Sequence, residues 1–112
     1  MPTLTALLAI GVLAFVACAG DQGGDTTARD LAAAVAIEGF LFTPTQLQVQ
    51  NGTTVTWTNQ DRFAHTVTSD AESFDSGDLA EGQSFEQSFD EPGTYPYHCA
   101  IHNYMTGTIT VS

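Results

Sequence analysis

The most informative part of this chain is the stretch Tyr95-Pro96-Tyr97-His98-Cys99-Ala100-Ile101-His102-Asn103-Tyr104-Met105. It has the pattern of a strand end, a short loop and the approach to a further strand. Within it, a thiol, an imidazole and a thioether follow one another with the spacing Cys99-x2-His102-x2-Met105. The stretch therefore predicts a loop, fixed between two strands, that presents three side chains able to bind a metal.

The donor types indicate which metal such a site would take. Cys99 and Met105 offer soft sulfur atoms, and His102 offers a borderline imidazole nitrogen. The chain has three histidines, and His65 is the one far from the loop. Two His and one Cys in a trigonal set, with a weak axial Met, form the ligand set of blue-copper electron-transfer sites. We therefore predict a copper site built from His65, Cys99, His102 and Met105.

Other interpretations of the same residues stay open at this point. A lone Cys is usually a small buried hydrophobe, and Cys99 could instead form a disulfide with Cys18 in an oxidising compartment. Zinc also accepts a His2Cys set, although Met is a poor zinc ligand. A copper delivery, storage or sensing module would use the same ligands, and a structural β-sandwich would bind no metal at all.

Strand periodicity sorts the side chains around the thiol. Side chains alternate across a strand, so an inward Cys99 places Tyr97 inward and turns His98 away. His98 is therefore not expected to be a ligand, although it is adjacent to the Cys. His65 is in phase with Val67, so it can face the same end of the core.

Charge excludes one class of partner. The 112 residues contain 13 acidic side chains against 2 Arg and no Lys, a formal charge of -11. Such a chain has no basic patch with which to neutralise phosphates, so no nucleic-acid partner is expected. The acidity fits a locally positive partner, a saline habitat that screens self-repulsion, or solubility alone.

The N-terminal residues predict export. Residues 3–19 form an apolar run that ends in small residues and has no charge, like the central region of a signal peptide, and residues 1–17 are the predicted signal peptide. Phe15-Val16-Ala17-Cys18 resembles a bacterial lipobox, in which Cys18 would become the lipid-modified first residue. Residues 18–33 then form a predicted flexible linker rich in Gly, Asp and Thr. We expect a periplasmic protein or one at the outer face of the cytoplasmic membrane, anchored through Cys18.

Residues 34–112 predict a single all-β domain. Alternating segments at 35–42 (broken at Gly39), 46–50, 53–58, 65–69, 84–89 and 108–112 are separated by turn residues. Asn51-Gly52 is a strong signal for a two-residue β-hairpin. About eight short strands at this spacing indicate a Greek-key β-sandwich.

The sequence from residue 33 to residue 112 resembles the cupredoxins of the plastocyanin/azurin group. The matching positions are Pro44-x2-Leu47-x-Val49-x2-Gly52-x2-Val55-x-Trp57-x-Asn59, Ala64-His65-x-Val67 and Gly93-Thr94-Tyr95-x-Tyr97-His98-Cys99-x2-His102-x2-Met105-x-Gly107-x-Ile109-x-Val111. The short Cys-x2-His-x2-Met loop is most similar to that of the amicyanins. The resemblance implies an eight-stranded sandwich with one type 1 copper ion on His65, Cys99, His102 and Met105.

Three positions beside the ligands depart from the family pattern. The family usually has Asn and Ser or Thr where this chain has Thr66 and Ala100, so the usual brace between two side chains cannot form. It usually has Pro at the position of Ile101, and Pro has no N–H. We therefore expect the Ile101 N–H to donate to the Cys99 sulfur in addition to the Thr66 N–H, which would raise the reduction potential.

The resemblance implies an electron carrier and not an enzyme. The sequence offers no nucleophile–base pair and no paired-carboxylate site. His102 would be the port for electrons, within an apolar patch contacted by redox proteins of an electron-transfer chain. The patch residues are Pro44, Phe63, Ala64, Ala100, Ile101 and Tyr104. We expect a monomer that meets its partners through a weak, transient interface.

Overall fold

The computed structural model describes residues 31–112, and in this range all regular structure is β. The predicted signal peptide (1–17), Cys18 and most of the predicted linker lie outside the described residues. No helix in the described range could cross a bilayer. The strands are β1 (Ala32–Glu38), β2 (Leu41–Thr43), β3 (Gln46–Val49), β4 (Thr53–Asn59), β5 (Thr68–Ser69), β6 (Ser84–Phe89), β7 (Gly93–His98) and β8 (Thr106–Val111).

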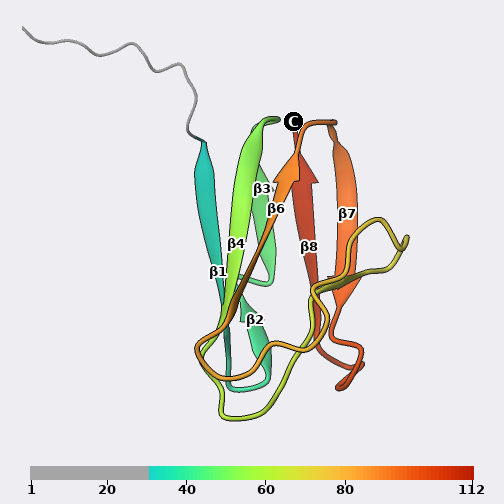
Figure 1. The fold of residues 1–112 in the computed structure, drawn as a ribbon. Coiled ribbons are helices and arrows are strands. Elements are labelled where there is room, and N and C mark those ends of the chain that lie inside the picture. The colour runs from blue at the N-terminus through green and yellow to red at the C-terminus, as the bar shows by residue number, and fades with distance from the viewer. Residues whose placement is uncertain (1–30) are drawn as a thin grey trace, which may run out of the picture. The chain divides into compact units, whose positions relative to one another are not determined.

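The strands form two sheets of four, with orders β2-β1-β4-β6 and β3-β8-β7-β5 (Figure 1). The pairs β1–β4 and β3–β8 are parallel, and the other pairs are antiparallel. The predicted all-β sandwich is therefore confirmed. Strand β1 begins at Ala32, so the last two residues of the predicted linker belong to it.

Alternation along the strands builds the core. In β4, Val55 and Trp57 are fully buried, while Thr54, Thr56 and Thr58 are partly exposed. In β8, Gly107, Ile109 and Val111 are buried in the same alternating manner. Burial of apolar surface from both sheets is the main force that stabilises such a sandwich.

The hairpin predicted at Asn51-Gly52 is wrong. Gly52 does adopt a left-handed conformation, with φ of 93°. However, β3 pairs with β8 in one sheet, whereas β4 pairs with β1 and β6 in the other. The turn therefore carries the chain from one sheet to the other. Turn residues signal a change of direction, but the partner of a strand is chosen by long-range packing.

The strand predicted at 65–69 is shorter than expected. Only Thr68–Ser69 forms β5, and His65 makes an isolated bridge with Leu79. The bridge is a reciprocal pair of backbone hydrogen bonds, at 3.1 and 2.7 Å. His65 is thus held by backbone pairing although it lies outside a regular strand. In Figure 1 its segment follows β4 and approaches the β7–β8 loop at the same end of the sandwich as the β1–β2 turn.

Candidate metal centre

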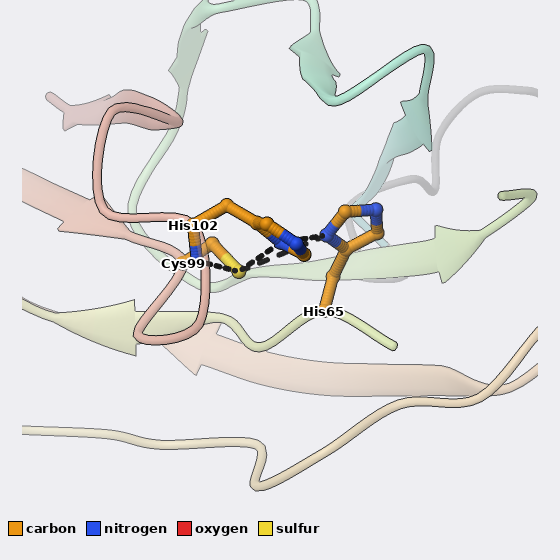
Figure 2. A group of neighbouring side chains, drawn as sticks. All are labelled: His65, Cys99 and His102. Carbon is orange, nitrogen blue, oxygen red and sulfur yellow. Dashed lines mark hydrogen bonds between the residues drawn. The ribbon is translucent and has the colours of Figure 1, made fainter. Parts of the chain in front are cut away.

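Two segments far apart in sequence bring three metal-binding side chains together. His65 comes from the segment after β4, Cys99 directly follows β7, and His102 lies in the loop before β8 (Figure 2). One potential ligand atom of each lies within 4.8 Å of the other two. The His65 and Cys99 side chains are fully buried, whereas His102 is partly exposed. Of these three side chains, only that of His102 reaches the surface.

The three donor atoms form a compact triangle. Cys99 Sγ lies 3.7 Å from His65 Nδ1 and 3.8 Å from His102 Nδ1, and the two Nδ1 atoms are 3.2 Å apart. In a trigonal set, bonds of about 2.0 Å to imidazole nitrogen and about 2.3 Å to thiolate sulfur would place nitrogen and sulfur about 3.7 Å apart and the two nitrogens about 3.5 Å apart. Both sulfur–nitrogen distances match these values, and the nitrogen–nitrogen distance of 3.2 Å is slightly shorter. A small rotation of the imidazole rings would therefore let all three side chains bind a single ion.

Met105 closes the loop that carries two of these residues. Its carbonyl accepts a hydrogen bond from Cys99 N at 3.0 Å, and its amide donates to the His102 carbonyl at 2.9 Å. Its side chain is 2% exposed and belongs to the same core cluster as Cys99. The thioether is thus in the core beside the site, which suits a weak axial ligand.

The Cys99 sulfur accepts two backbone hydrogen bonds. Thr66 N donates at 3.3 Å, as expected, and His102 N donates at 3.5 Å. The Ile101 amide, which we expected to be the second donor, has no such bond within the described part of the chain. The loop turns so tightly between Cys99 and Met105 that the amide one residue later faces the sulfur. Cys99 is free of any disulfide within residues 31–112.

A brace between the two ligand segments does form, by a different route from the usual one. Thr66 Oγ1 accepts a hydrogen bond from Ala100 N at 2.7 Å. It also pairs with Thr68 Oγ1 at 2.8 Å. A side-chain-to-backbone contact therefore replaces the contact between two side chains, and the missing hydroxyl at Ala100 does not leave the segments unconnected.

Asp61, which the sequence analysis did not identify, contacts one of the proposed ligands. Its Oδ2 lies 2.9 Å from His65 Nε2, so Nδ1 is the nitrogen that His65 turns toward Cys99. Burial raises the pKa of the Asp61 carboxyl, but hydrogen bonds from Phe40, Gly39 and His65 lower it by more, and the net pKa is below 3.8. The only sequence signal for this contact is the Asp-x3-His spacing, which is too common to be specific.

The chain is similar to known proteins in sequence and in structure. Residues 6–111 match the cupredoxin-like domain. The chain belongs to the cupredoxin family. This cupredoxin is 37% identical over 85 residues to a plastocyanin of Scenedesmus fuscus, which covers 64% of this chain and 87% of that protein.

An amicyanin, the kind of cupredoxin that the ligand loop resembles, and a halocyanin are also similar to this chain. This cupredoxin is 34% identical to the amicyanin of Paracoccus denitrificans, over 73% of this chain and 66% of that one. It is 42% identical to a halocyanin of Natronomonas pharaonis, over 65% of this chain. The match spans about half, 49%, of the halocyanin.

Solved structures agree with the fold. A novel purple cupredoxin from Nitrosopumilus maritimus is similar with a TM-score of 0.67 and 35% identity, over 71% of this chain and 99% of that one. The Cu(I) form of an amicyanin variant is similar with a TM-score of 0.70 and 30% identity, over 77% and 87%. The predicted cupredoxin fold is therefore confirmed. The grouped His and Cys side chains are of the types that bind copper.

Proposed function

We propose that this cupredoxin is a type 1 copper protein that carries single electrons between redox proteins outside the cytoplasm. His65, Cys99 and His102 would be the trigonal ligands and Met105 the axial one. The observation that carries the proposal is the triangle formed by two imidazole Nδ1 atoms and one buried sulfur. Bound copper would supply the Cu(II)/Cu(I) couple, which exchanges one electron.

The protein's part is to keep the ligands still. His65 is held by its reciprocal backbone bridge to Leu79, and Cys99 by its backbone bond to Met105. Two amides fix the position of the sulfur. Ligands locked in this way change little between oxidation states, and a small reorganisation favours fast electron exchange.

We further propose that electrons pass through the partly exposed His102. Four large apolar side chains at this end of the molecule are strongly exposed, which is unusual for a surface without a partner. This apolar patch consists of Leu41 (60% exposed), Phe63 (58%), Ile101 (47%) and Tyr104 (69%). A surface groove of about 370 Å³ continues it, lined by Gly39, Phe40, Leu41, Phe42, Thr45, Tyr104, Met105 and Thr106.

Such a patch suits a brief encounter with a redox protein, because a small apolar contact desolvates easily and releases quickly. Pro44 and Ala100, expected in the patch, are also exposed, and Ala64 is partly exposed. Leu41 was not expected there. The acidic chain would favour a partner with a positive surface, provided that salt is low enough not to screen it.

The location outside the cytoplasm rests on the N-terminal sequence. Residues 1–17 would direct export, and Cys18 would carry a lipid that anchors the domain to a membrane by the linker. Mass spectrometry of the mature protein tests both points. Removal of residues 1–17 with an acylated Cys18 is the expected result, and an unmodified N-terminus ahead of Cys18 would contradict it.

A delivery or storage role is the second candidate, and the structure gives it no specific support. A module that hands over metal needs ligands that a partner can reach, whereas Cys99 is 0% exposed. Two measurements on the copper-loaded full chain distinguish the roles. A carrier cycles reversibly in voltammetry and gives up its copper slowly to a Cu(I) chelator. Fast metal loss without a reversible wave would support delivery instead.

A further inference from the structure

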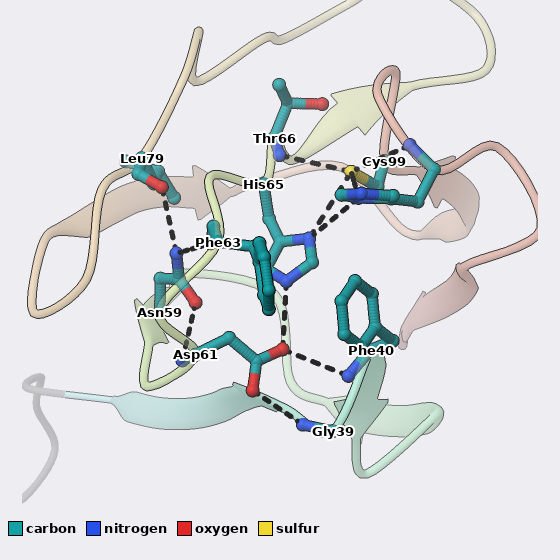
Figure 3. Close-up of polar contacts among 10 residues, drawn as sticks. Gly39, Phe40, Asn59, Asp61, Phe63, His65, Thr66, Leu79 and Cys99 are labelled. Carbon is teal, nitrogen blue, oxygen red and sulfur yellow. Dashed lines mark hydrogen bonds and ion pairs between the residues drawn. The ribbon is translucent and has the colours of Figure 1, made fainter.

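The Asp61 carboxylate joins the β1–β2 turn to a predicted copper ligand. Its Oδ1 accepts a hydrogen bond from Gly39 N at 2.8 Å. Its Oδ2 accepts one from Phe40 N at 2.9 Å and lies 2.9 Å from His65 Nε2 (Figure 3). The side chain is 12% exposed. Three N–H groups from two distant segments thus converge on one nearly buried anion.

The turn is shaped to present its two amides to this anion. Gly39 and Phe40 have φ of 66° and 60°, and they connect β1 to β2 through the pair Glu38–Leu41. Two consecutive left-handed residues form the tight turn preferred in hairpins, and Phe is an unusual residue at such a φ. Successive backbone N–H groups in such a turn can form a small anion-binding concavity. Asp61 fills it.

A buried residue fixes Asp61 from the other side. Asn59 Oδ1 accepts a hydrogen bond from Asp61 N at 2.9 Å. Asn59 Nδ2 donates to the carbonyls of Phe63 and Leu79, both at 2.8 Å, and the Asn59 side chain is 0% exposed. Because Leu79 is also the bridge partner of His65, Asn59 ties the carboxylate and the histidine to one frame.

The contact determines which nitrogen of His65 is available to a metal. A neutral imidazole has one N–H and one lone pair. With Nε2–H donating to the carboxylate, the lone pair is on Nδ1, which faces Cys99 Sγ and His102 Nδ1. Carboxylates placed behind a metal-bound histidine orient the ring and make its nitrogen a stronger donor.

The same turn also places an aromatic ring against both histidines. The Phe40 ring meets His65 edge-on at 5.2 Å between centroids and His102 at 5.0 Å. The Phe40 amide is one of the two backbone amides that donate a hydrogen bond to the Asp61 carboxylate. The carboxylate therefore orders one ligand ring directly and, through Phe40, helps confine the second.

We propose that Asp61 is a positioning residue that sets the tautomer of His65 and shifts the copper couple toward Cu(II), lowering the reduction potential; this rests on the copper-carrying function proposed above. A negative charge behind a ligand increases its electron donation, and Cu(II) gains more from this than Cu(I) does. The carboxylate lies against Nε2, on the side of the His65 ring away from Cys99, so its effect on bound copper would pass through that ring.

The test compares Asp61→Asn with Asp70→Asn in the full chain. Asp70 Oδ1 lies 2.6 Å from Nδ1 of His98, which the sequence excludes as a ligand. Both variants remove one carboxylate beside a histidine, but only Asp61→Asn removes it from His65. An amide has one acceptor oxygen, so the Asp61→Asn side chain cannot accept from all three N–H groups.

For Asp61→Asn we expect Cu(II) affinity to fall about tenfold to a hundredfold. Cu(I) affinity should fall less, so that the reduction potential rises. Asp70→Asn should leave the copper affinities and the reduction potential unchanged. Equal potential shifts in the two variants would overturn the proposal, because they would reflect overall charge. Loss of stability in Asp61→Asn at an unchanged potential would also overturn it, because the role would then be structural only.

A metal-free measurement separates this inference from the function on which it rests. Nitrogen-15 NMR of the apo protein reports which ring nitrogen of His65 carries the proton. We expect Nε2–H in the wild type and a mixture of tautomers in Asp61→Asn. An Nδ1–H tautomer in the wild type would overturn the inference even if the site binds copper, and even if Asp61→Asn does not fold. Failure to bind copper with the expected tautomer present would instead overturn the proposed function.

Discussion

The hydroxyl of Thr66 accepts a hydrogen bond from the Ala100 amide at 2.7 Å, across the gap between the two ligand segments. Thr66 follows His65 and Ala100 follows Cys99, so this one bond sets the spacing between two predicted ligands. The Thr66 amide bonds the Cys99 sulfur from the same residue. The brace and the sulfur contact therefore depend on one backbone position.

Replacing Thr66 with Val tests the brace. The shape is conserved, but the Ala100 N–H loses its acceptor, so we expect the free energy of unfolding of the apo protein to fall by about 1 to 3 kcal/mol. Denaturant unfolding measures this change. Thr58→Val is the matched control, since Thr58 Oγ1 pairs with Ser84 Oγ at an exposed site and should cost less than about 0.5 kcal/mol. Equal losses in both variants would contradict the special role of the Thr66 bond.

Gly107 is required by the ring of Tyr97. A Cβ at residue 107 would clash with Cζ and Oη of that ring. Tyr97 is 1% exposed, and its ring packs between Phe42 and Trp57, with distances of 4.7 and 5.4 Å between ring centroids. The ring therefore cannot move aside easily. We expect Gly107→Ala to lower the free energy of unfolding by about 1 to 3 kcal/mol, as measured by denaturant titration.

A double variant shows whether the ring is the cause. In Gly107→Ala combined with Tyr97→Leu, the ring that meets the new Cβ is gone. The loss from Gly107→Ala should then be much smaller in the Tyr97→Leu background than in the wild type. Strictly additive losses would mean that Gly107 is needed for some other reason.

Tyr97 predicts an alkaline loss of stability. Burial raises its pKa from 10.0 to about 12, and Trp57 opposes this only in part. Between pH 10 and 12 the unfolded chain loses the phenol proton while the folded chain keeps it, so stability falls as pH rises. The slope from this group is about 1.4 kcal/mol per pH unit. The free energy of unfolding of Tyr97→Phe should fall less steeply with pH, by that amount, between pH 10 and 12. Urea unfolding at several pH values measures this slope.

The same variant should have little effect at neutral pH. Tyr97 Oη and Trp57 Nε1 are both buried, and neither has a hydrogen-bond partner among residues 31–112, so removing the hydroxyl breaks no hydrogen bond there. Parallel stability curves for wild type and Tyr97→Phe above pH 10 would show that Tyr97 does not cause the alkaline loss.

Ile101→Pro tests the arrangement of amides at the sulfur. The donors in the structure are Thr66 N and His102 N, so removing the Ile101 N–H should not remove a hydrogen bond. We expect the reduction potential of the copper-loaded variant to change by less than about 59 mV, the equivalent of a tenfold change for one electron. A larger fall would restore the Ile101 N–H as a donor.

Much of the candidate site could be proposed from the sequence because three of the proposed ligands are close together in the chain. Cys99, His102 and Met105 lie within seven residues, and strand periodicity correctly turned His98 away from the site. His65 could be added because the chain has only one histidine outside that stretch. Alternation likewise predicted the buried faces of β4 and β8, since a period of two depends only on neighbouring residues.

Contacts between distant segments could not be predicted in the same way. Asn51-Gly52 marks a turn, but the pairing of β3 with β8 depends on residues about sixty positions later. Asp61 and Phe40 border the site because a turn from β1 reaches the segment after β4. The amide that faces the Cys99 sulfur depends on how tightly the loop closes, which residue types alone do not determine.

The optical and EPR spectra of the full chain after addition of Cu(II) test the central claim most directly, with Cys99→Ser as control. We predict an intense thiolate-to-copper band and an unusually small copper hyperfine splitting, both lost in Cys99→Ser. A pale protein with wide splitting, or one whose spectrum is unchanged by Cys99→Ser, would show that Cys99 does not bind the copper and would contradict the electron-carrier account.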